Sequence, residues 1–208
     1  ERDRVLLVGG YVLLAFWILF TIIQFRLSGH EATFWFCNIA VFFLVVACFE
    51  KVLPLFYLVL GMALFFETPW VLDWAIYFLS GYSFFSISEL YAGLPLHFMV
   101  LTFIRHMLTV PFVIAALFLF KPERMSKKAI LMGVFGILVF MGISYGLGAD
   151  SNINCIHRPC FSALQGIFTG VWYSAAWTLL VIGVSLFSLF FVAYPIHTLI
   201  WKLRLKFF

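Results

Sequence analysis

The chain has 208 residues, of which 65% are hydrophobic and 11% charged, with a formal net charge of +4 at pH 7. Its mean hydropathy of +1.11 exceeds what a soluble domain of this length could bury, which excludes a soluble globular protein. The small positive charge reflects where basic residues lie relative to a membrane, and we expect no nucleic-acid partner. The composition therefore predicts an all-α fold, with a single integral membrane helical domain over residues 1–208.

Six stretches of the sequence are apolar enough to cross a membrane as helices. In chain order they are Val5–Phe25, Phe34–Phe49, Val52–Phe66, Leu94–Phe120, Ala129–Leu147 and Gly166–Ile196. The first is too long for the core of a signal peptide and lacks a small-residue cleavage site, so we expect a span. The second and third are short, and would extend into their flanks or lie in locally thinned bilayer. The sequence thus predicts a polytopic transmembrane bundle of six spans.

The segment Trp70–Ser88 lies between the third and fourth predicted spans. It is apolar enough to enter a membrane but carries Asp73, Gly81 and several serines. As a seventh span it would move the amino terminus, with two arginines, away from the other basic residues. Its tryptophan and tyrosine side chains are typical of the lipid headgroup level. We therefore expect an interfacial or re-entrant helix on the outer face.

Lysine and arginine are distributed unevenly between the two sides of the predicted bundle. One side would hold Arg2, Arg4, Lys51, Lys121, Arg124, Lys127, Lys128, Lys202, Arg204 and Lys206. The other side would hold Arg26 and Arg158. Because basic residues are enriched in cytoplasmic loops, both termini are expected in the cytoplasm. We predict a multi-pass integral membrane protein, in the plasma or inner membrane if the chain is bacterial.

With this orientation, the uncommon polar residues fall in the outer half of the spans or in the outer loops. They are His30, Glu31, Cys37, Asn38, Glu67, Asp73, Glu89, His97, Asp150, Asn152, Asn154, Cys155, His157 and Cys160. The second, third and fourth spans and the last outer loop would therefore converge on a cavity that opens to the outer leaflet. We expect membrane lipids as partners there, with Asn38, Glu67, His97 and Asn154 as candidate substrate-binding residues.

Arg105 and His106 are neighbours inside the apolar run Leu94–Phe120. A charge at this depth costs roughly 2.5–3.5 kcal/mol on insertion scales, so such residues normally face the protein interior and a partner. Arg105 remains charged and needs a carboxylate, backbone carbonyls or a lipid phosphate. Glu67 is the candidate carboxylate, and a purely structural ion pair is the alternative. A deeply buried His106 is expected to be neutral, while His97, nine residues earlier, should face the opposite side of the helix.

Cys37 lies among aromatic residues near the start of the second predicted span. A cysteine in such a setting most often packs as a small apolar side chain. Alternatively it is a nucleophile, which requires a base such as His106 or His97 to form the thiolate. Both interpretations remain open from spacing alone, whereas Cys48, near the cytoplasmic end, is interpreted as packing.

No metal or cofactor is expected. The histidines and carboxylates lack HExxH or other metal-binding spacing, and haem-attachment, P-loop and dinucleotide motifs are absent. Cys155 and Cys160 lie in the last outer loop, on the oxidising side. They would form a local disulfide, or Cys155 and Cys160 would bind a metal together with His157.

Four short motifs resemble, in order and rough spacing over about residues 34–190, a known family of six-span proteins. They are Phe36-Cys37-Asn38, Gly61-Met-Ala-Leu-Phe-Phe-Glu-Thr-Pro69, Phe103-Ile-Arg-His106 and Asn152-Ile-Asn-Cys155. The family joins the bacterial YwaF-type integral membrane proteins to the eukaryotic transmembrane protein 164 group. The resemblance implies a phospholipid acyltransferase that uses a cysteine and a histidine.

Carried over by position, the resemblance makes Cys37 the catalytic nucleophile and His106 the general base. We further expect Arg105 to bind a lipid phosphate and Asn38 to donate to the oxyanion. The leading hypothesis is therefore a lipid-modifying acyltransferase or acyl hydrolase that acts near the outer leaflet. The alternative is a non-catalytic binding or transport subunit, as a homo-oligomer or as a component of a larger membrane complex.

Overall fold

The computed structural model describes residues 2–28, 35–83, 94–119, 126–147, 155, 157 and 171–207, and within them it contains seven α-helices, one π-helical segment and no strand. In chain order these are α1 (Arg2–Ser28), α2 (Phe36–Glu50), α3 (Leu53–Ser80), α4 (Leu96–Leu119), α5 (Lys127–Gly146), α7 (Val171–Ser188), the π-helix η4 (Leu189–Ala193) and α8 (Tyr194–Phe207). The described residues therefore confirm the all-α class.

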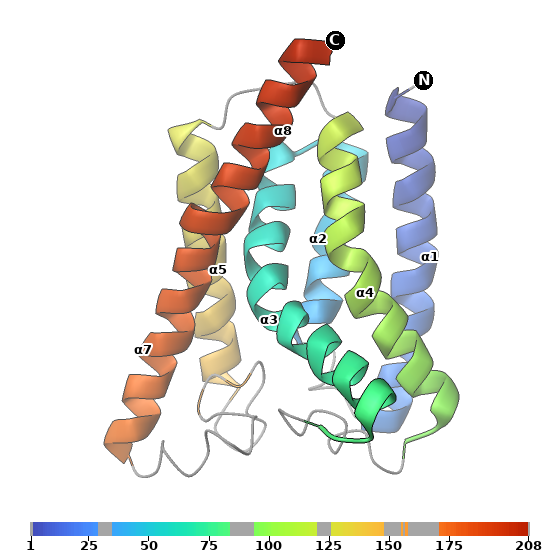
Figure 1. The fold of residues 1–208 in the computed structure, drawn as a ribbon, viewed down its shortest axis with the longest axis vertical. Helices are drawn as coiled ribbons and strands as arrows, with labels where there is room; N and C mark the ends of the chain where they lie inside the picture. Colours follow the sequence, from blue (N-terminus) through green and yellow to red (C-terminus); the bar gives the residue numbers. More distant parts are fainter. Residues whose placement is uncertain are drawn as a thin grey trace.

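The helices run alternately up and down in one bundle (Figure 1). α7, η4 and α8 follow one another as a long rod across the front of the view, with α5 and α3 behind it. The two ends of the chain lie at the same end of the bundle, whereas α1, α3 and α5 end at the opposite end. This arrangement fits an even number of crossings between the termini.

Three helices among the described residues are long and apolar enough to cross a membrane, namely Asp3–Leu27, Leu96–Leu119 and Ala175–Leu203. The two parts of α3 make a fourth if they are counted as one bent span. α2 and the apolar part of α5 are shorter. The structure thus has the features of a multi-pass helical membrane protein with three to four candidate spans, fewer than the six predicted.

α3 differs from its predicted form because it continues beyond the expected third span as far as Ser80. Its parts Leu53–Leu64 and Glu67–Ser80 meet at an angle of 42°. Pro69 explains the bend, since it lacks a backbone N–H and its ring presses on the carbonyl four residues earlier. The expected interfacial or re-entrant helix Trp70–Ser88 is therefore the second half of α3 where it is described, and residues 84–88 lie outside the described residues.

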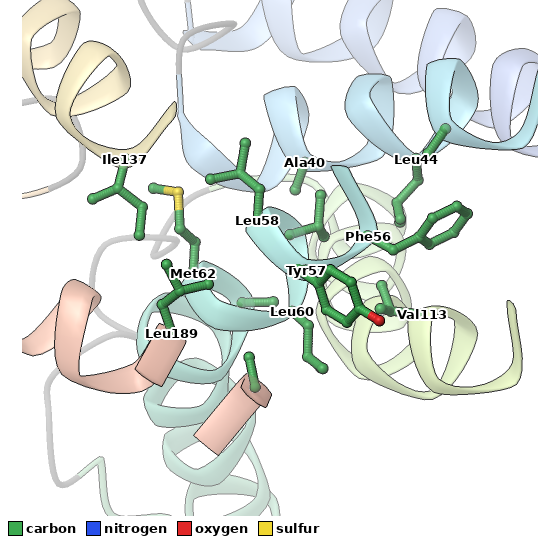
Figure 2. Close-up of a cluster of buried hydrophobic side chains, with 14 of the residues drawn as sticks. Ala40, Leu44, Phe56, Tyr57, Leu58, Leu60, Met62, Val113, Ile137 and Leu189 are labelled. Carbon is green, nitrogen blue, oxygen red and sulfur yellow. The ribbon is translucent and has the colours of Figure 1, made fainter. Parts of the chain in front are cut away.

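The core is centred on the first half of α3, where residues 56–63 are all buried. A helix buried on every side must be surrounded by others. Figure 2 shows α3 residues such as Phe56 and Leu60 among Ala40 and Leu44 of α2, Val113 of α4, Ile137 of α5 and Leu189 of η4. α3 is thus the central element against which the remaining helices pack.

Glycines allow α3, α5 and η4 to pack closely. A Cβ atom added to Gly61 would lie 3.2 Å from the Cα of Leu189, and one added to Gly133 would lie 3.1 Å from a methyl group of the same leucine. A Cβ on Gly136 would lie only 2.9 Å from a methyl group of Leu58. Small residues at such contacts are the usual means by which membrane helices approach one another.

The π-helical segment η4 interrupts the last rod and ends two residues before Pro195. The backbone N–H of Tyr194 donates to the carbonyl of Leu189, five residues earlier. Proline cannot donate a helical hydrogen bond and crowds the preceding turn, and a π-bulge relieves that crowding. The bulge also places Leu189 between the glycines of α3 and α5.

Candidate functional site

The most unusual group of side chains is a buried polar cluster contributed by four helices. We call Gln24 of α1, Cys37 and Asn38 of α2, Glu67 of α3 and Arg105 of α4 the Arg105 cluster. None of these five residues is more than 8% exposed. Polar groups buried within membrane helices are costly unless they are paired or perform a function, which makes the cluster the candidate site.

Arg105 is 4% exposed and has two partners on neighbouring helices. Its Nη1 donates to Oδ1 of Asn38. Its guanidinium carbon also lies 4.0 Å from the centroid of the Phe20 ring, which is a cation–π contact. Because helical side chains point toward the helix amino terminus, the guanidinium is carried toward the start of α2. Its Nε has no hydrogen-bond partner among the described residues.

The amide of Asn38 links three helices. Its oxygen accepts from Arg105, and its Nδ2 donates to Oε1 of Gln24. Arginine has donors only, so the amide oxygen must face Arg105 and the amide nitrogen must face Gln24. Asn38 therefore fixes the position of the guanidinium relative to α1 and α2.

Glu67 is 1% exposed and lies at the bend of α3. It interacts electrostatically with Arg105, yet the two residues form no ion pair among those the described residues contain. Neither carboxylate oxygen has a hydrogen-bond partner in that part of the chain. The Thr109 hydroxyl is nearby, but its single proton is donated to the carbonyl of Arg105 at 2.8 Å. Glu67 is thus a buried carboxylate with unused acceptor capacity.

Cys37 is a free, buried thiol in the first turn of α2. The charged groups that act on it are Arg105 and Glu67. Cys48, the other free thiol of the described residues, is buried in the apolar core instead. The two cysteines therefore have different surroundings, and of the two only Cys37 is acted on by charged groups.

His106, the next residue along α4, has Thr102 and Trp70 as its contacts among the described residues. Its Nδ1 lies 2.7 Å from the carbonyl oxygen of Thr102, and its ring stacks on Trp70 of α3 with a centroid separation of 4.6 Å. A carbonyl accepts only, so Nδ1 carries a proton and donates it to Thr102. Successive residues of a helix point about 100° apart, which explains why the pair separates.

The remaining predicted site residues are not brought into the Arg105 cluster. His97 is exposed in the first turn of α4, on a different side from buried His106, as the helical periodicity predicts. Asn154 lies outside the described residues. No hydrogen bond joins Cys37 to His106 in the described part of the chain.

The predicted outer loop is described only at two positions, Cys155 and His157. Cys155 is disulfide-bonded, which agrees with the predicted disulfide, and its expected partner Cys160 lies outside the described residues. A disulfide sulfur is not a thiolate ligand, so Cys155 does not belong to a metal site with His157. Among the described residues no three His, Cys, Asp or Glu side chains come together as metal ligands.

Several contact residues carried no signal in the sequence. Phe20 is one of 28 phenylalanines, and nothing in its spacing marks it as the contact of Arg105. Gln24, four residues later, repeats the helical period and lies on the same face of α1. A second buried polar pair, Tyr57 of α3 with His197 of α8, was also missed; the Tyr57 hydroxyl is hydrogen-bonded to Nδ1 of His197.

Comparisons of the chain with protein-family models, with curated proteins and with solved structures find no match. The class of protein therefore follows from the fold and the Arg105 cluster alone. It is an all-α protein with the apolar helices of a multi-pass membrane protein. A buried polar site lies among α1, α2, α3 and α4.

Proposed function

We propose that this protein is a membrane lipid-modifying enzyme, a Cys37-dependent phospholipid acyltransferase or acyl hydrolase. The observation that carries the proposal is a buried free thiol, Cys37, one residue before the Asn38 that hydrogen-bonds to the buried Arg105. Thioester chemistry needs a thiol nucleophile and a base that removes its proton. The resemblance to the YwaF-type and transmembrane protein 164 family favours the same reaction.

In this proposal Cys37 attacks the ester carbonyl of a phospholipid and takes the acyl chain as a thioester. Arg105 attracts the lipid phosphate, because guanidinium groups bind phosphate oxygens through several N–H donors. Asn38 carries the amide N–H groups proposed to stabilise the oxyanion. The resemblance assigns the general base to His106. Transfer to an alcohol or to water then releases the thiol.

The substrate is expected at the outer leaflet. Gln24, Asn38 and Arg105 lie toward the end of the bundle at which α1 ends and α2 begins, opposite the chain termini (Figure 1). A disulfide at Cys155 supports an oxidising environment. We therefore propose that both termini are cytoplasmic and that the Arg105 cluster is reached by lipid from the outer side.

The test is acyl transfer from a phospholipid with a labelled acyl chain, using purified protein in lipid nanodiscs. Cys37→Ala is expected to abolish protein-bound label and transfer, because the nucleophile is removed. Cys48→Ala is the matched control, since it removes the other buried free thiol, and it should retain both. Acyl transfer by Cys37→Ala at the wild-type rate would contradict the proposal.

A non-catalytic function remains the second candidate, and one observation favours it. Cys37 and His106 are not hydrogen-bonded, whereas a thiol and its base usually are in enzymes of this kind. The Arg105 cluster would then bind an anionic lipid headgroup without reacting with it. This candidate predicts that phosphatidic acid binds wild-type protein and Cys37→Ala equally, and that neither forms a thioester.

A further inference from the structure

We propose that the buried guanidinium of Arg105 binds the carboxylate of a free fatty acid, whose acyl chain lies in the bilayer along the outside of α4. The proposal goes beyond the proposed function, because it concerns binding alone and does not require Cys37 to react. It rests on the unused N–H groups of Arg105, their fixed direction, their depth in the bilayer and the exposed apolar residues beside them.

The first feature is the unsatisfied charge of Arg105. A guanidinium has five N–H donors, and among the described residues it makes one hydrogen bond, from Nη1 to Asn38. Its Nε is buried without a partner in that part of the chain. The ion pair found there joins Lys51 to Asp3 and does not include Arg105. Because a buried charge is stable only with a counter-charge, we infer that an anionic ligand is the missing partner.

The second feature is the fixed direction of the unused donors. Nη1 is held by Asn38, whose amide is in turn hydrogen-bonded to Gln24. Phe20 covers one face of the guanidinium at 4.0 Å, and its ring stacks on Phe98 with a centroid separation of 5.6 Å. These contacts leave the edge formed by Nε and Nη2. Two parallel N–H groups on such an edge match the two oxygens of a carboxylate.

The third feature is the depth of Arg105 along α4. The helix has 24 residues and is therefore about 36 Å long, slightly more than the roughly 30 Å hydrocarbon core of a bilayer. Arg105 follows the first residue, Leu96, by about 14 Å along the helix axis. With α4 centred in the bilayer, the Arg105 backbone lies about 10 Å inside the core, and its side chain points back toward the start of the helix.

The length of α2 leads to the same depth. α2 ends next to Lys51, which pairs with Asp3 in the first turn of α1. Its 15 residues extend about 22 Å, so its first turn, with Asn38, stops roughly 8 Å short of the opposite edge of the core. A phosphate could reach this depth only with its polar glycerol and headgroup. A fatty-acid carboxylate is attached directly to an acyl chain and brings no other polar group, so the depth favours the carboxylate.

The fourth feature is the apolar face next to Arg105. Ile104 and Leu108 are 39% and 58% exposed, and residues four apart lie on the same face of a helix. Ile104 precedes Arg105 directly, so the exposed face and the guanidinium are separated by about 100° around α4. An acyl chain lying against Ile104 and Leu108 can therefore place its carboxylate at Arg105 while the chain remains among lipid tails.

The experiment measures binding of palmitate, isotope-labelled at the carboxyl carbon, to purified protein in phosphatidylcholine nanodiscs by NMR. It uses wild-type protein and the Cys37→Ala variant, which cannot form a thioester. Both should show about one bound palmitate per protein, with a carboxyl signal distinct from that of palmitate dissolved in the bilayer. Unlabelled palmitate should displace the bound signal, whereas methyl palmitate, which has the same chain without a charge, should not.

Two substitutions test the role of the guanidinium. Arg105→Gln should weaken palmitate binding at least about tenfold, because the charge-assisted hydrogen bonds are lost. Asn38→Asp should weaken it to a similar extent while it keeps the hydrogen bond to Arg105, because its carboxylate neutralises the same cation. This second variant carries the test if Arg105→Gln does not fold. Lys202→Gln, which removes an exposed cation of α8, is the control and should bind like wild type.

The outcomes separate a carboxylate site from other forms of binding. Displacement by methyl palmitate, or wild-type affinity in Asn38→Asp, would overturn the proposal, since the acyl chain alone would then account for binding. Tighter competition by dipalmitoyl phosphatidic acid than by palmitate would identify a phosphate site and overturn the carboxylate assignment. Palmitate binding by Cys37→Ala together with failed acyl transfer in wild type would contradict the proposed function and leave the fatty-acid site supported.

Discussion

Arg105 is accommodated in an apolar helix because two different kinds of partner stabilise its positive charge. The amide oxygen of Asn38 accepts a hydrogen bond from it, and the face of Phe20 covers the guanidinium. The sequence reveals that Arg105 needs such partners, since an unpaired charge is too costly at that depth. It cannot identify Asn38 or Phe20, because the pairing depends on how α1, α2 and α4 pack.

Replacing Asn38 tests this arrangement. Asn38→Leu should lower the thermal stability of the purified protein in detergent by about 1–3 kcal/mol, because Arg105 loses its buried acceptor and Gln24 its donor. Asn38→Asp should retain more stability, since a carboxylate also accepts from Arg105. Phe42→Leu, on the exposed face of the same helix, is the control. Equal melting temperatures for Asn38→Leu and Phe42→Leu would contradict the account.

The catalytic candidates show the same limit of sequence reasoning at the residue scale. Cys37, Glu67 and Arg105 stand out in the sequence because their chemistry is unusual in apolar helices. All three are buried, and Arg105 is hydrogen-bonded to Asn38, the residue after Cys37. His106 stands out for the same reason but faces Trp70. Side chains of successive helical residues point about 100° apart. Which of the two side chains points toward α2 depends on how the helices pack.

α3 determines the packing of the other elements. Its first half is buried on all sides, and its bend carries Glu67 and Trp70 toward α4. Hydropathy predicts that a helix begins near Val52, and the structure agrees within a residue. The same reasoning ended the apolar stretch at Phe66. Within a bundle, neighbouring helices stabilise a proline bend, and the helix continues to Ser80.

The contact between α3 and α5 provides a test at the scale of elements. Gly136→Leu should destabilise the protein by about 1–3 kcal/mol, because even a Cβ at that position approaches a methyl group of Leu58 to 2.9 Å. Gly142→Leu, on the same helix, meets nothing within 4 Å of its Cβ position among the described residues and serves as the control. Thermal unfolding in detergent measures both. Comparable losses in the two variants would rule out close packing at Gly136.

The Tyr57–His197 pair links α3 to α8 and provides a second test. Tyr57→Phe removes the hydroxyl from a buried hydrogen bond and should cost about 1 kcal/mol of stability. In a double-mutant cycle with His197→Phe, the combined loss should be smaller than the sum of the single losses, because both remove the same bond. Additive losses would show that the bond contributes nothing.

At the scale of the whole molecule, the distribution of charge and the arrangement of the helices agree. Lys51, directly after α2, forms an ion pair of 2.6 Å with Asp3 in the first turn of α1. The two ends of the chain lie at the same end of the bundle (Figure 1). Cys155, which is disulfide-bonded, belongs to the segment after α5, a helix that ends at the opposite end. The class of membrane protein can be predicted from the sequence, because a lipid environment requires apolar helices. The number of full-length spans cannot, because it depends on where each helix ends, and hydropathy does not define those ends.

The proposed orientation can be measured with a membrane-impermeant maleimide on intact cells. Tyr82→Cys, an exposed position after α3, should be labelled from outside. Lys127→Cys, an exposed position at the start of α5, should be labelled only after the membrane is permeabilised. The free thiols of the described residues, Cys37 and Cys48, are buried and should contribute little background. Labelling of both positions from one side would contradict a bundle in which α3 and α5 place them at opposite ends.

The most direct test of the central claim is mass spectrometry of the peptide that contains Cys37. Wild-type protein is incubated with phospholipid vesicles, quenched with acid and digested. We predict a hydroxylamine-sensitive acyl adduct on Cys37 and none on Cys48. An unmodified Cys37 in a preparation that transfers acyl chains, or transfer that persists in Cys37→Ala, would contradict the account.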